Sequence, residues 1–363
     1  MKLFVVSDLH GHADLFKKAL QESGFDPKNP EHLLIVCGDC FDRGRQNRAV
    51  LEYLRCIPNK VLIRGNHEDM LMQAMERGSI GTLEVANGTI HTIQEFFGAE
   101  SIGVNGKLYL KSEIQTELSD FISEMVDYFE TEHYVFTHGW VPLDIQWGEM
   151  KLRRDWRTAS VTAWEQARFI GWNKVYQQRL TLSDKTVVCG HRGAHYGHSF
   201  DSTRAPRCHD PFYGKGLIAI DALTVASNQV NILVLEEEVP TSRIHSMKLQ
   251  KEHFDHIAEG SKIIEMRLYD EKRRKIRLGD TIEFTCDQEE NQTIRTKVQG
   301  LYVYPGFDEL VEDFTPTEMG FSKTARIKIS EYMLRLYGVE AAFKNKAIAI
   351  KVKVMENDTH LPQ

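Results

Sequence analysis

The sequence predicts an α/β layered core followed by a second, smaller domain. Three observations support this fold class. Short apolar runs that end in polar residues recur through the first 240 residues, helix-like segments separate them, and the pattern changes after the acidic, proline-containing segment at residues 236–243. Apolar runs of this length are typical of buried strands, and strands that alternate with helices form layered α/β cores.

The first part of the chain contains five such runs. They are LFVVSD ending at Asp8, LLIVCGD at Asp39, KVLIRGN at Asn66, HYVFTH at His138 and TVVCGH at His191. Helix-like segments lie between them at residues 13–23, 47–55 and 68–77, and two later runs, GLIAIDA and QVNILVLE, are expected to complete the sheets. In α/β folds, ligands bind at the carboxyl ends of the strands. The polar strand ends therefore predict the functional site.

Composition limits the class of protein. The 363 residues are 42% hydrophobic and 27% charged, as in a soluble globular protein with enough apolar material for two domains. No apolar run approaches the roughly 20 residues of a membrane helix, and the N-terminus turns polar too early for a signal peptide, so we expect a cytoplasmic protein with no membrane partner. Lys+Arg and Asp+Glu balance from residue 241 onward, which leaves the net charge of −7 in the first 240 residues. That acidity argues against non-specific nucleic-acid binding there.

The segment CGDCFDRG, residues 37–44, has two interpretations. Its Cys-x-x-Cys is a pattern that zinc sites and redox pairs use, but the same segment contains two carboxylates and an arginine. The six cysteines are scattered through a long chain, unlike the dense framework of a small secreted domain, so we expect reduced thiols.

The polar strand ends form a mixed oxygen and nitrogen donor set, which suits Mn, Fe or Zn. If Asp39 bridges two ions, Asp8 and His10 complete one site, and a second set completes the other: Asn66, His138 and His191. Centres of this kind hold their ions about 3.5–4 Å apart and clamp both oxygens of an in-line displacement at phosphorus.

The order, spacing and types of these residues resemble the calcineurin-like metallophosphoesterase superfamily. Within it, GDxxDRG and RGNHE are most similar to the serine/threonine protein phosphatase branch, including its bacterial and bacteriophage lambda type. The resemblance covers residues 1–240 and implies a four-layer α/β/β/α sandwich. It favours the carboxylates of residues 37–44, and it leaves Cys37 and Cys40 as small buried residues.

The resemblance implies a role for each motif residue. Two divalent ions, Mn²⁺ first with Fe or Zn as alternatives, would be held by Asp8, His10, Asp39, Asn66, His138 and His191. His67 would protonate the leaving alkoxide, and Asp42 would orient its ring. Arg43 and Asn66 would bind the phosphoryl oxygens. A second phosphate arginine is expected, assigned on spacing to Arg168, with Arg192 and Arg154 as alternatives.

Further histidines and tryptophans keep two interpretations each. His12 is either a neighbour of the metal ligands or a solvated loop residue. In GHRGAHYGH, Gly193 stands where many superfamily members have another ligand, and His195 and His198 remain alternatives for metal contact. The tryptophans are interpreted as core or groove wall, with substrate contact as the alternative: Trp147, Trp156, Trp164 and Trp172. Residues 70–130 have helical periodicity and are expected to cover part of the cleft.

The second domain is predicted at residues 244–358. Its opening segment at residues 260–284 resembles the ASCH domain, a small PUA-like β-barrel, through Gly260, Lys262, Glu265, Arg267 and Leu268. The resemblance implies a pocket for RNA, a nucleotide or a modified base, with Lys262, Glu265 and Arg267 at its edge. A basic run at residues 272–277 is either a phosphate-binding patch or a solvated turn.

These features predict a metal-dependent phosphoester hydrolase, with phosphorylated protein as the first substrate class. The alternative is a phosphatase or phosphodiesterase that acts on RNA ends, nucleotides or dinucleoside polyphosphates, because one metal centre serves all of these and the fold does not fix the substrate. A non-catalytic RNA-binding scaffold is disfavoured, since the ligand positions, His67, Asp42 and Arg43 are all present.

Overall fold

The computed structural model describes residues 1–200, 208–238, 241–289, 291–322 and 326–355. The chain divides into two compact units, the first formed by Met1–Arg153 with Glu165–Pro240 and the second by Arg154–Trp164 with Thr241–Gln363. The sequence did not predict that residues 154–164 group with the second unit. Among the described residues, no helix has the length and apolar character needed to cross a membrane.

The first unit contains a four-stranded sheet of order β11-β1-β2-β3. Its first three strands in the sequence run parallel and β11 runs antiparallel to β1: β1 (Lys2–Val6), β2 (His32–Cys37), β3 (Lys60–Ile63) and β11 (Leu233–Glu236). Successive side chains of a strand point to opposite faces. Leu3 and Val5 accordingly belong to one apolar cluster, and Phe4 and Val6 to another. Burial on both faces explains why β1 is a continuous apolar run.

A five-stranded sheet of order β4-β5-β8-β10-β9 packs against the first. Its strands are β4 (Tyr128–Glu130), β5 (Tyr134–Thr137), β8 (Thr186–Cys189), β9 (Phe212–Gly214) and β10 (Leu217–Ala219). Strands β5, β8 and β10 are parallel. One apolar cluster joins Leu3 and Ile35 of the first sheet to Phe136, Val188 and Ile218 of the second, so the two inner faces form a common core.

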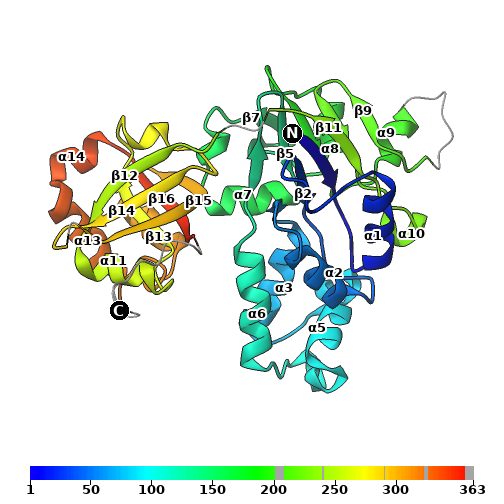
Figure 1. The fold of residues 1–363 in the computed structure, drawn as a ribbon, viewed down its shortest axis with the longest axis horizontal. Coiled ribbons are helices and arrows are strands. Elements are labelled where there is room, and N and C mark those ends of the chain that lie inside the picture. The colour runs from blue at the N-terminus through cyan, green and yellow to red at the C-terminus, as the bar shows by residue number, and fades with distance from the viewer. Residues whose placement is uncertain (201–207, 239–240, 290, 323–325, 356–363) are drawn as a thin grey trace. The chain divides into compact units, whose positions relative to one another are not determined.

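Helices cover the outer face of each sheet. Those that share an apolar cluster with the first sheet are coloured blue to cyan in Figure 1: α1 (Ala13–Glu22), α2 (Asn47–Arg55), α3 (Asn66–Arg77), α5 (Thr89–Phe97) and α6 (Ser112–Ser123). Helix α4 (Thr82–Asn87) contacts α3 and α5. The other helices of this unit are α8 (Trp172–Gln177), α9 (His195–Phe200) and α10 (Thr224–Ser227). Helix α7 (Val161–Arg168) is divided between the units, because its first four residues group with the second. On the second sheet, Trp172 of α8 stacks on Phe212 of β9 with ring centroids 5.6 Å apart. The predicted α/β/β/α sandwich is confirmed.

Two features of this unit interrupt the layers. Helices α3 to α6 form a helical segment between β3 and β4, and short 3₁₀ turns at Ala99–Ser101 and Val104–Gly106 connect α5 to α6. A two-stranded hairpin of β6 (Leu143–Gln146) and β7 (Glu149–Leu152) follows β5. The hairpin was not predicted.

The second unit contains a five-stranded sheet of order β12-β14-β15-β16-β13 that curls around its own core (Figure 1). Its strands are β12 (Ile244–Leu249), β13 (Ile264–Leu268), β14 (Thr281–Cys286), β15 (Thr293–Tyr304) and β16 (Ala347–Val354). Its helices are α11 (Lys251–Ala258), α12 (Phe307–Asp313), α13 (Arg326–Tyr337) and α14 (Val339–Lys344). The pairing register shifts between Val298 and Gly300, and such irregularities bend long strands. This architecture confirms the predicted small β-barrel-like domain.

Candidate metal centre

The centre lies where the strands of both sheets end. Asp8, Asp39 and Asn66 follow the parallel strands β1, β2 and β3, so the three side chains meet at one edge of the first sheet. His138 and His191 follow β5 and β8 of the second sheet in the same way. The loops are also joined to one another, because Asp8 N–H donates to Gly38 O at 3.1 Å and His10 N–H donates to Asp39 O at 3.0 Å.

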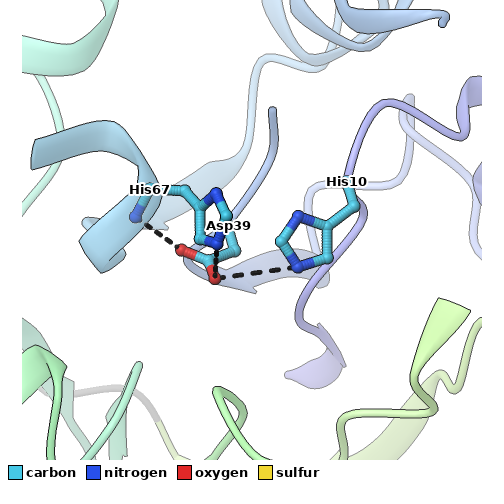
Figure 2. Close-up of side chains that lie close together, drawn as sticks. All are labelled: His10, Asp39 and His67. Carbon is cyan, nitrogen blue, oxygen red and sulfur yellow. Dashed lines mark hydrogen bonds and ion pairs between the residues drawn. The ribbon is translucent and has the colours of Figure 1, made fainter. Parts of the chain in front are cut away.

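Asp39 occupies the middle of the cluster. Its Oδ2 lies 3.8 Å from His10 Nε2 and 3.8 Å from His67 Nε2, and its Oδ1 lies 3.3 Å from His138 Nε2. Figure 2 shows the rings of His10 and His67 with the Asp39 carboxylate. In the described part of the chain, three groups have ligand atoms within 4.8 Å of one another, and two of them lie here: His10, Asp39 and His67, and Asp39, His138 and His191. The third, formed by Glu132, His133 and Glu237, does not include Asp39. Asp39 belongs to the first two groups, as a bridging ligand does.

The other predicted ligands contact this core. Asp8 Oδ1 lies 3.9 Å from His10 Nε2, and Asn66 Oδ1 lies 2.9 Å from His138 Nε2. Carbonyl oxygens accept from Nδ1 of two rings, that of Phe41 from His10 at 3.0 Å and that of Cys37 from His138 at 2.8 Å. A proton fixed on Nδ1 leaves Nε2 as the donor atom for a cation, which is the usual arrangement of a metal-binding histidine.

The backbone around the centre is strained. Residues other than glycine rarely adopt positive φ angles. Six residues around the centre do so: Asp8 (52°), His10 (44°), Asp39 (55°), Asp42 (74°), Arg43 (62°) and His191 (63°). Such strain collects at functional sites, where the surrounding structure compensates for it. Glycine is also required for close approach, because a Cβ on Gly65 would lie 2.2 Å from Asp39 Oδ1 and one on Gly190 would lie 2.1 Å from Asp8 Oδ2.

The electrostatics fit bound cations. Burial raises the pKa of Asp8 well above its usual range, and the neighbouring Asp221 raises it further. Burial also opposes ionisation of Asp39, but His138 and His67 beside it outweigh that effect and hold its pKa well below the usual range. Against the cost of burial, Asp39 raises the pKa of His138 to about 10. Divalent ions would replace these protons as the positive charge between buried carboxylates.

The catalytic residues that the sequence predicted lie beside this cluster. His67 Nδ1–H donates to Asp42 Oδ2 at 2.8 Å, and Arg43 Nη2 lies 3.1 Å from His67 Nε2. Burial lowers the pKa of His67, but Asp39 and the hydrogen bond to Asp42 outweigh it, so the net shift is upward. In the tautomer that donates from Nδ1 to Asp42, His67 Nε2 accepts from Arg43 Nη2 and lies 3.8 Å from Asp39 Oδ2.

Comparison with known proteins agrees with this geometry. Residues 1–219 match calcineurin-like phosphoesterases, and residues 247–356 match the ASCH domain. The chain belongs to the calcineurin-like phosphoesterase family. A segment of 86 residues is 38% identical to serine/threonine-protein phosphatase 2 of Escherichia coli (strain K12), covering 24% of this chain and 38% of that protein.

Two other proteins that this chain resembles are named for activities other than serine/threonine phosphatase. A 77-residue segment is 32% identical to the symmetrical bis(5'-nucleosyl)-tetraphosphatase of Glaesserella parasuis serovar 5 (strain SH0165), covering 21% of this chain and 28% of that protein. The crystal structure of a cold-active protein-tyrosine phosphatase from a psychrophilic Shewanella is 15% identical with a TM-score of 0.41, covering 65% of this chain and 75% of that chain. The chain spans at most 38% of the length of these curated relatives.

Arg168 of this calcineurin-like phosphoesterase has a buried side chain. Its Nη1 donates to Asp69 Oδ2 at 2.6 Å, its Nη2 donates to Asp127, and its side chain is only 5% exposed. Two buried carboxylates thus pair with the guanidinium, and one of them, Asp69, also pairs with Arg64 at 2.6 Å. The assignment of Arg168 to the phosphate site stays a prediction.

Arg192 is exposed and adjoins His191. Burial, together with His138 and Arg192, lowers the pKa of His191 to about 3 against the opposite effect of Asp39.

Other predicted candidates lie outside the cluster. His198 Nε2–H donates to Asp210 O at 2.9 Å, and His12 Nδ1 hydrogen-bonds to His10 O at 2.6 Å. Among the described residues, neither His195 nor His198 joins a group of ligand atoms. The tryptophans Trp156, Trp164 and Trp172 are buried, and Trp147 is fully exposed at the tip of the β6–β7 hairpin.

The cysteine pair does not support redox or zinc chemistry. Cys37 and Cys40 are free and fully buried. Burial raises the pKa of both thiols, and neighbouring carboxylates, Asp8 for Cys37 and Glu68 for Cys40, raise it further, which disfavours the thiolate form. A thiol must ionise to act as a nucleophile or a metal ligand.

Sequence reasoning missed two buried carboxylates beside the centre. Asp221 follows β10, and burial together with Asp39 raises its pKa to about 6 despite a hydrogen bond from Leu223 N–H. It is the last polar residue of the run GLIAIDA, so the strand-end pattern already contained the signal. Glu68 is the other, and it accepts backbone N–H groups from Asp39 (3.0 Å), Cys40 (2.8 Å) and Gly65 (2.9 Å).

Glu68→Gln is expected to weaken metal binding by about 10-fold to 100-fold, the usual effect of losing a residue that orients metal ligands. The amide of glutamine has only one acceptor oxygen. Its NH₂ group would therefore face backbone N–H groups of the Asp39 loop, and two donors repel each other. Isothermal titration with Mn²⁺ measures the change. The matched control is Glu84→Gln, because Glu84 accepts the Gly81 N–H at the start of α4 in the same way. Equal Mn²⁺ affinity in the two variants would contradict this role.

The second unit has a cavity of about 200 Å³ around the predicted ASCH residues. Glu265 is buried, with Oε2 3.0 Å from Lys262 Nζ and Oε1 2.7 Å from Arg267 Nε. Lys262 and Arg267 therefore lower the pKa of Glu265 against the effect of burial. Further side chains line the cavity, including His253, Phe321 and Tyr332. In the basic run, Arg273 pairs with Asp270, and Lys272, Arg274, Lys275 and Arg277 are exposed.

Proposed function

We propose that the protein is a metal-dependent phosphomonoesterase, first of all a serine/threonine-type phosphoprotein phosphatase. The observation that carries the proposal is the position of Asp39 in two groups of ligand atoms, with the His67–Asp42 pair beside them. Asp8 and His10 would complete one ion site with Asp39. The second site would also use Asp39, with Asn66, His138 and His191. Two divalent ions held there, Mn²⁺ first with Fe or Zn as alternatives, would make the nucleophile by lowering the pKa of bound water.

The chain's own residues perform the remaining steps. Arg43 would bind phosphoryl oxygens, since its guanidinium adjoins His67 Nε2 and a planar, permanently charged fork matches them. Asn66 would add its side-chain amide. His67 would transfer its Nε2 proton to the departing alkoxide, with Asp42 holding the ring in place through Nδ1. Leaving-group protonation matters for serine and threonine phosphates because an alkoxide is a poor leaving group.

The alternative substrate class is a nucleotide or RNA phosphate, and one observation favours it. The cavity of the second unit has room for one nucleobase and contains both a buried anion, Glu265, and a buried cation, Lys262. We infer that this cavity binds a nucleotide or an RNA base. Calorimetric titration with nucleosides and short oligoribonucleotides tests the inference. It is wrong if neither binds, or if Lys262→Ala leaves binding unchanged.

Turnover on three substrates decides between the two substrate classes. A phosphoserine peptide, a 3′-phosphorylated oligoribonucleotide and a dinucleoside tetraphosphate would be compared with the same Mn²⁺-loaded protein. The phosphoprotein proposal expects the largest kcat/KM on the peptide. A clear preference for the oligonucleotide or the dinucleoside tetraphosphate would overturn it in favour of the alternative.

A further inference from the structure

Helix α5 presents a buried polar face to the loop that contains Asp42 and Arg43. Thr89, Thr92 and Glu95 are spaced three residues apart, so they lie along one side of the helix. Thr89 and Thr92 have no exposed surface. Buried hydroxyl groups need hydrogen-bond partners, and these two direct theirs at a single side chain.

That side chain is Asp42. Thr89 Oγ1–H donates to Asp42 Oδ2 at 2.7 Å, and Thr92 Oγ1–H donates to Asp42 Oδ1 at 2.6 Å. Thr92 Oγ1 also accepts the Asp42 N–H at 3.0 Å. The same Oδ2 accepts from His67 Nδ1 at 2.8 Å. Each carboxylate oxygen of Asp42 therefore accepts from a hydroxyl group on α5, and Oδ2 also accepts a hydrogen bond from His67 Nδ1–H.

The contacts continue along the loop. Arg43 N–H donates to Gly88 O at 3.3 Å, and the ring of His91 hydrogen-bonds to Arg43 O through Nδ1 at 2.7 Å. A Cβ on Gly88 would lie 2.5 Å from Arg43 N, so this approach requires glycine. Glu95 accepts the backbone N–H of Asn47 at 2.8 Å, at the start of α2. The α5 segment thus contacts the middle of the loop, at Asp42 and Arg43, and the residue where α2 begins, Asn47.

We propose that Thr89 and Thr92 are positioning residues for the general acid. They fix the rotation of the Asp42 carboxylate about its terminal torsion. Without such hydrogen bonds a carboxylate has no strongly preferred value of this torsion. A fixed Oδ2 sets the direction of His67 Nδ1–H, and therefore the place where His67 Nε2 meets a leaving group. The proposal rests on the proposed function, in which His67 protonates the alkoxide.

This role differs from that of an ordinary buried hydrogen bond. A hydrogen bond that only stabilises the fold affects the turnover of all substrates alike. A positioning role predicts a loss only where protonation of the leaving group limits the rate. An alkyl phosphate monoester needs that proton, whereas an activated aryl phosphate leaves without it. The ratio of the two turnover rates therefore isolates the acid step from folding and from metal binding.

The experiment is a double-mutant cycle on Mn²⁺-loaded protein, using Thr92→Val, His67→Asn and the double variant. We expect Thr92→Val to lower kcat on the alkyl ester by about 10-fold, a part of the roughly 10²–10⁴-fold that general acids contribute, and to leave the aryl ester almost unaffected. Thr92→Ser keeps the hydroxyl and is expected to restore the alkyl rate. In the His67→Asn background, Thr92→Val should have no further effect, since residues that act as a unit are not additive.

Two further variants make the result decisive. Thr89→Val repeats the test at the other carboxylate oxygen if Thr92→Val fails to fold. Thr296→Val is the matched control for stability, because Thr296 is fully buried in the second unit and donates one hydrogen bond to Ile282 O at 3.2 Å. It is expected to leave the ratio of the two rates unchanged.

The outcomes separate the two proposals. Suppose that His67→Asn slows only the alkyl ester, as the general-acid role predicts. The positioning role is then overturned if Thr92→Val slows both esters alike, or if Thr92→Val has its full effect in the His67→Asn background as well. The general-acid role of His67 stands in both cases. If His67→Asn itself slows both esters alike, the general-acid assignment is wrong and the positioning role is overturned with it.

Discussion

Asp39→Asn is expected to remove both metal ions and nearly all hydrolysis. Asp39 faces His10 and His67 on one side and His138 on the other, so its charge serves both groups of ligands. Its Oδ1 also accepts the His67 N–H at 3.0 Å, which ties the start of α3 to the centre. Cations contribute several kcal/mol of transition-state stabilisation, which corresponds to a loss on the order of 10³ or more in kcat.

Metal content per chain, measured by atomic emission alongside turnover, checks this expectation. The control is Asp120→Asn on the exposed surface of α6, which should keep both ions and full activity. If Asp39→Asn retained two ions per chain and wild-type turnover, Asp39 would not be a shared ligand.

His67→Asn is expected to lower turnover on alkyl phosphates by about 10²–10⁴-fold while metal content stays unchanged. In the proposed mechanism the side chain of His67 would supply the proton and Asp42 would orient its ring, whereas the proposed metal ligands are other side chains. Activated phenyl phosphates should lose much less, because their leaving group departs without protonation.

Parallel rate and metal assays on the two classes of ester provide the measurement. Asp42→Asn serves as a companion variant and should show the same selectivity, because an amide can present its NH₂ group to His67 Nδ1 in place of an acceptor. Equal losses on both esters in His67→Asn would exclude the general-acid role. A loss of bound metal would instead make His67 a ligand, which its 3.8 Å distance from Asp39 Oδ2 also permits geometrically.

The sequence predicted which side chains lie together because strand ends are local features. Asp8, Asp39 and Asn66 each follow an apolar run, and parallel pairing of β1, β2 and β3 then brings them together without further information. Asp221 obeys the same rule after β10 and was missed only because GLIAIDA was treated as a completing strand. The layered fold followed from the same pattern, since strands buried on both faces read as continuous apolar runs.

The sequence could not predict the partners of residues that meet only through tertiary packing. Arg168 has a suitable spacing, but Asp69 and Asp127 come to its guanidinium only through the packing of α3 and the chain before β4. Thr89 and Thr92 lie some fifty residues from Asp42 in sequence, and nothing local connects them to it. The grouping of residues 154–164 with the second unit likewise depends on contacts that no motif encodes.

We propose that this chain hydrolyses phosphate monoesters at a metal centre built on Asp39. The most direct test is the hydrolysis rate of Mn²⁺-loaded protein on a phosphate monoester and on the matched diester, with Asp39→Asn as the background. We predict a strong preference for the monoester that disappears in the variant. A preference for the diester, or equal rates in the wild-type protein and Asp39→Asn, would contradict the claim.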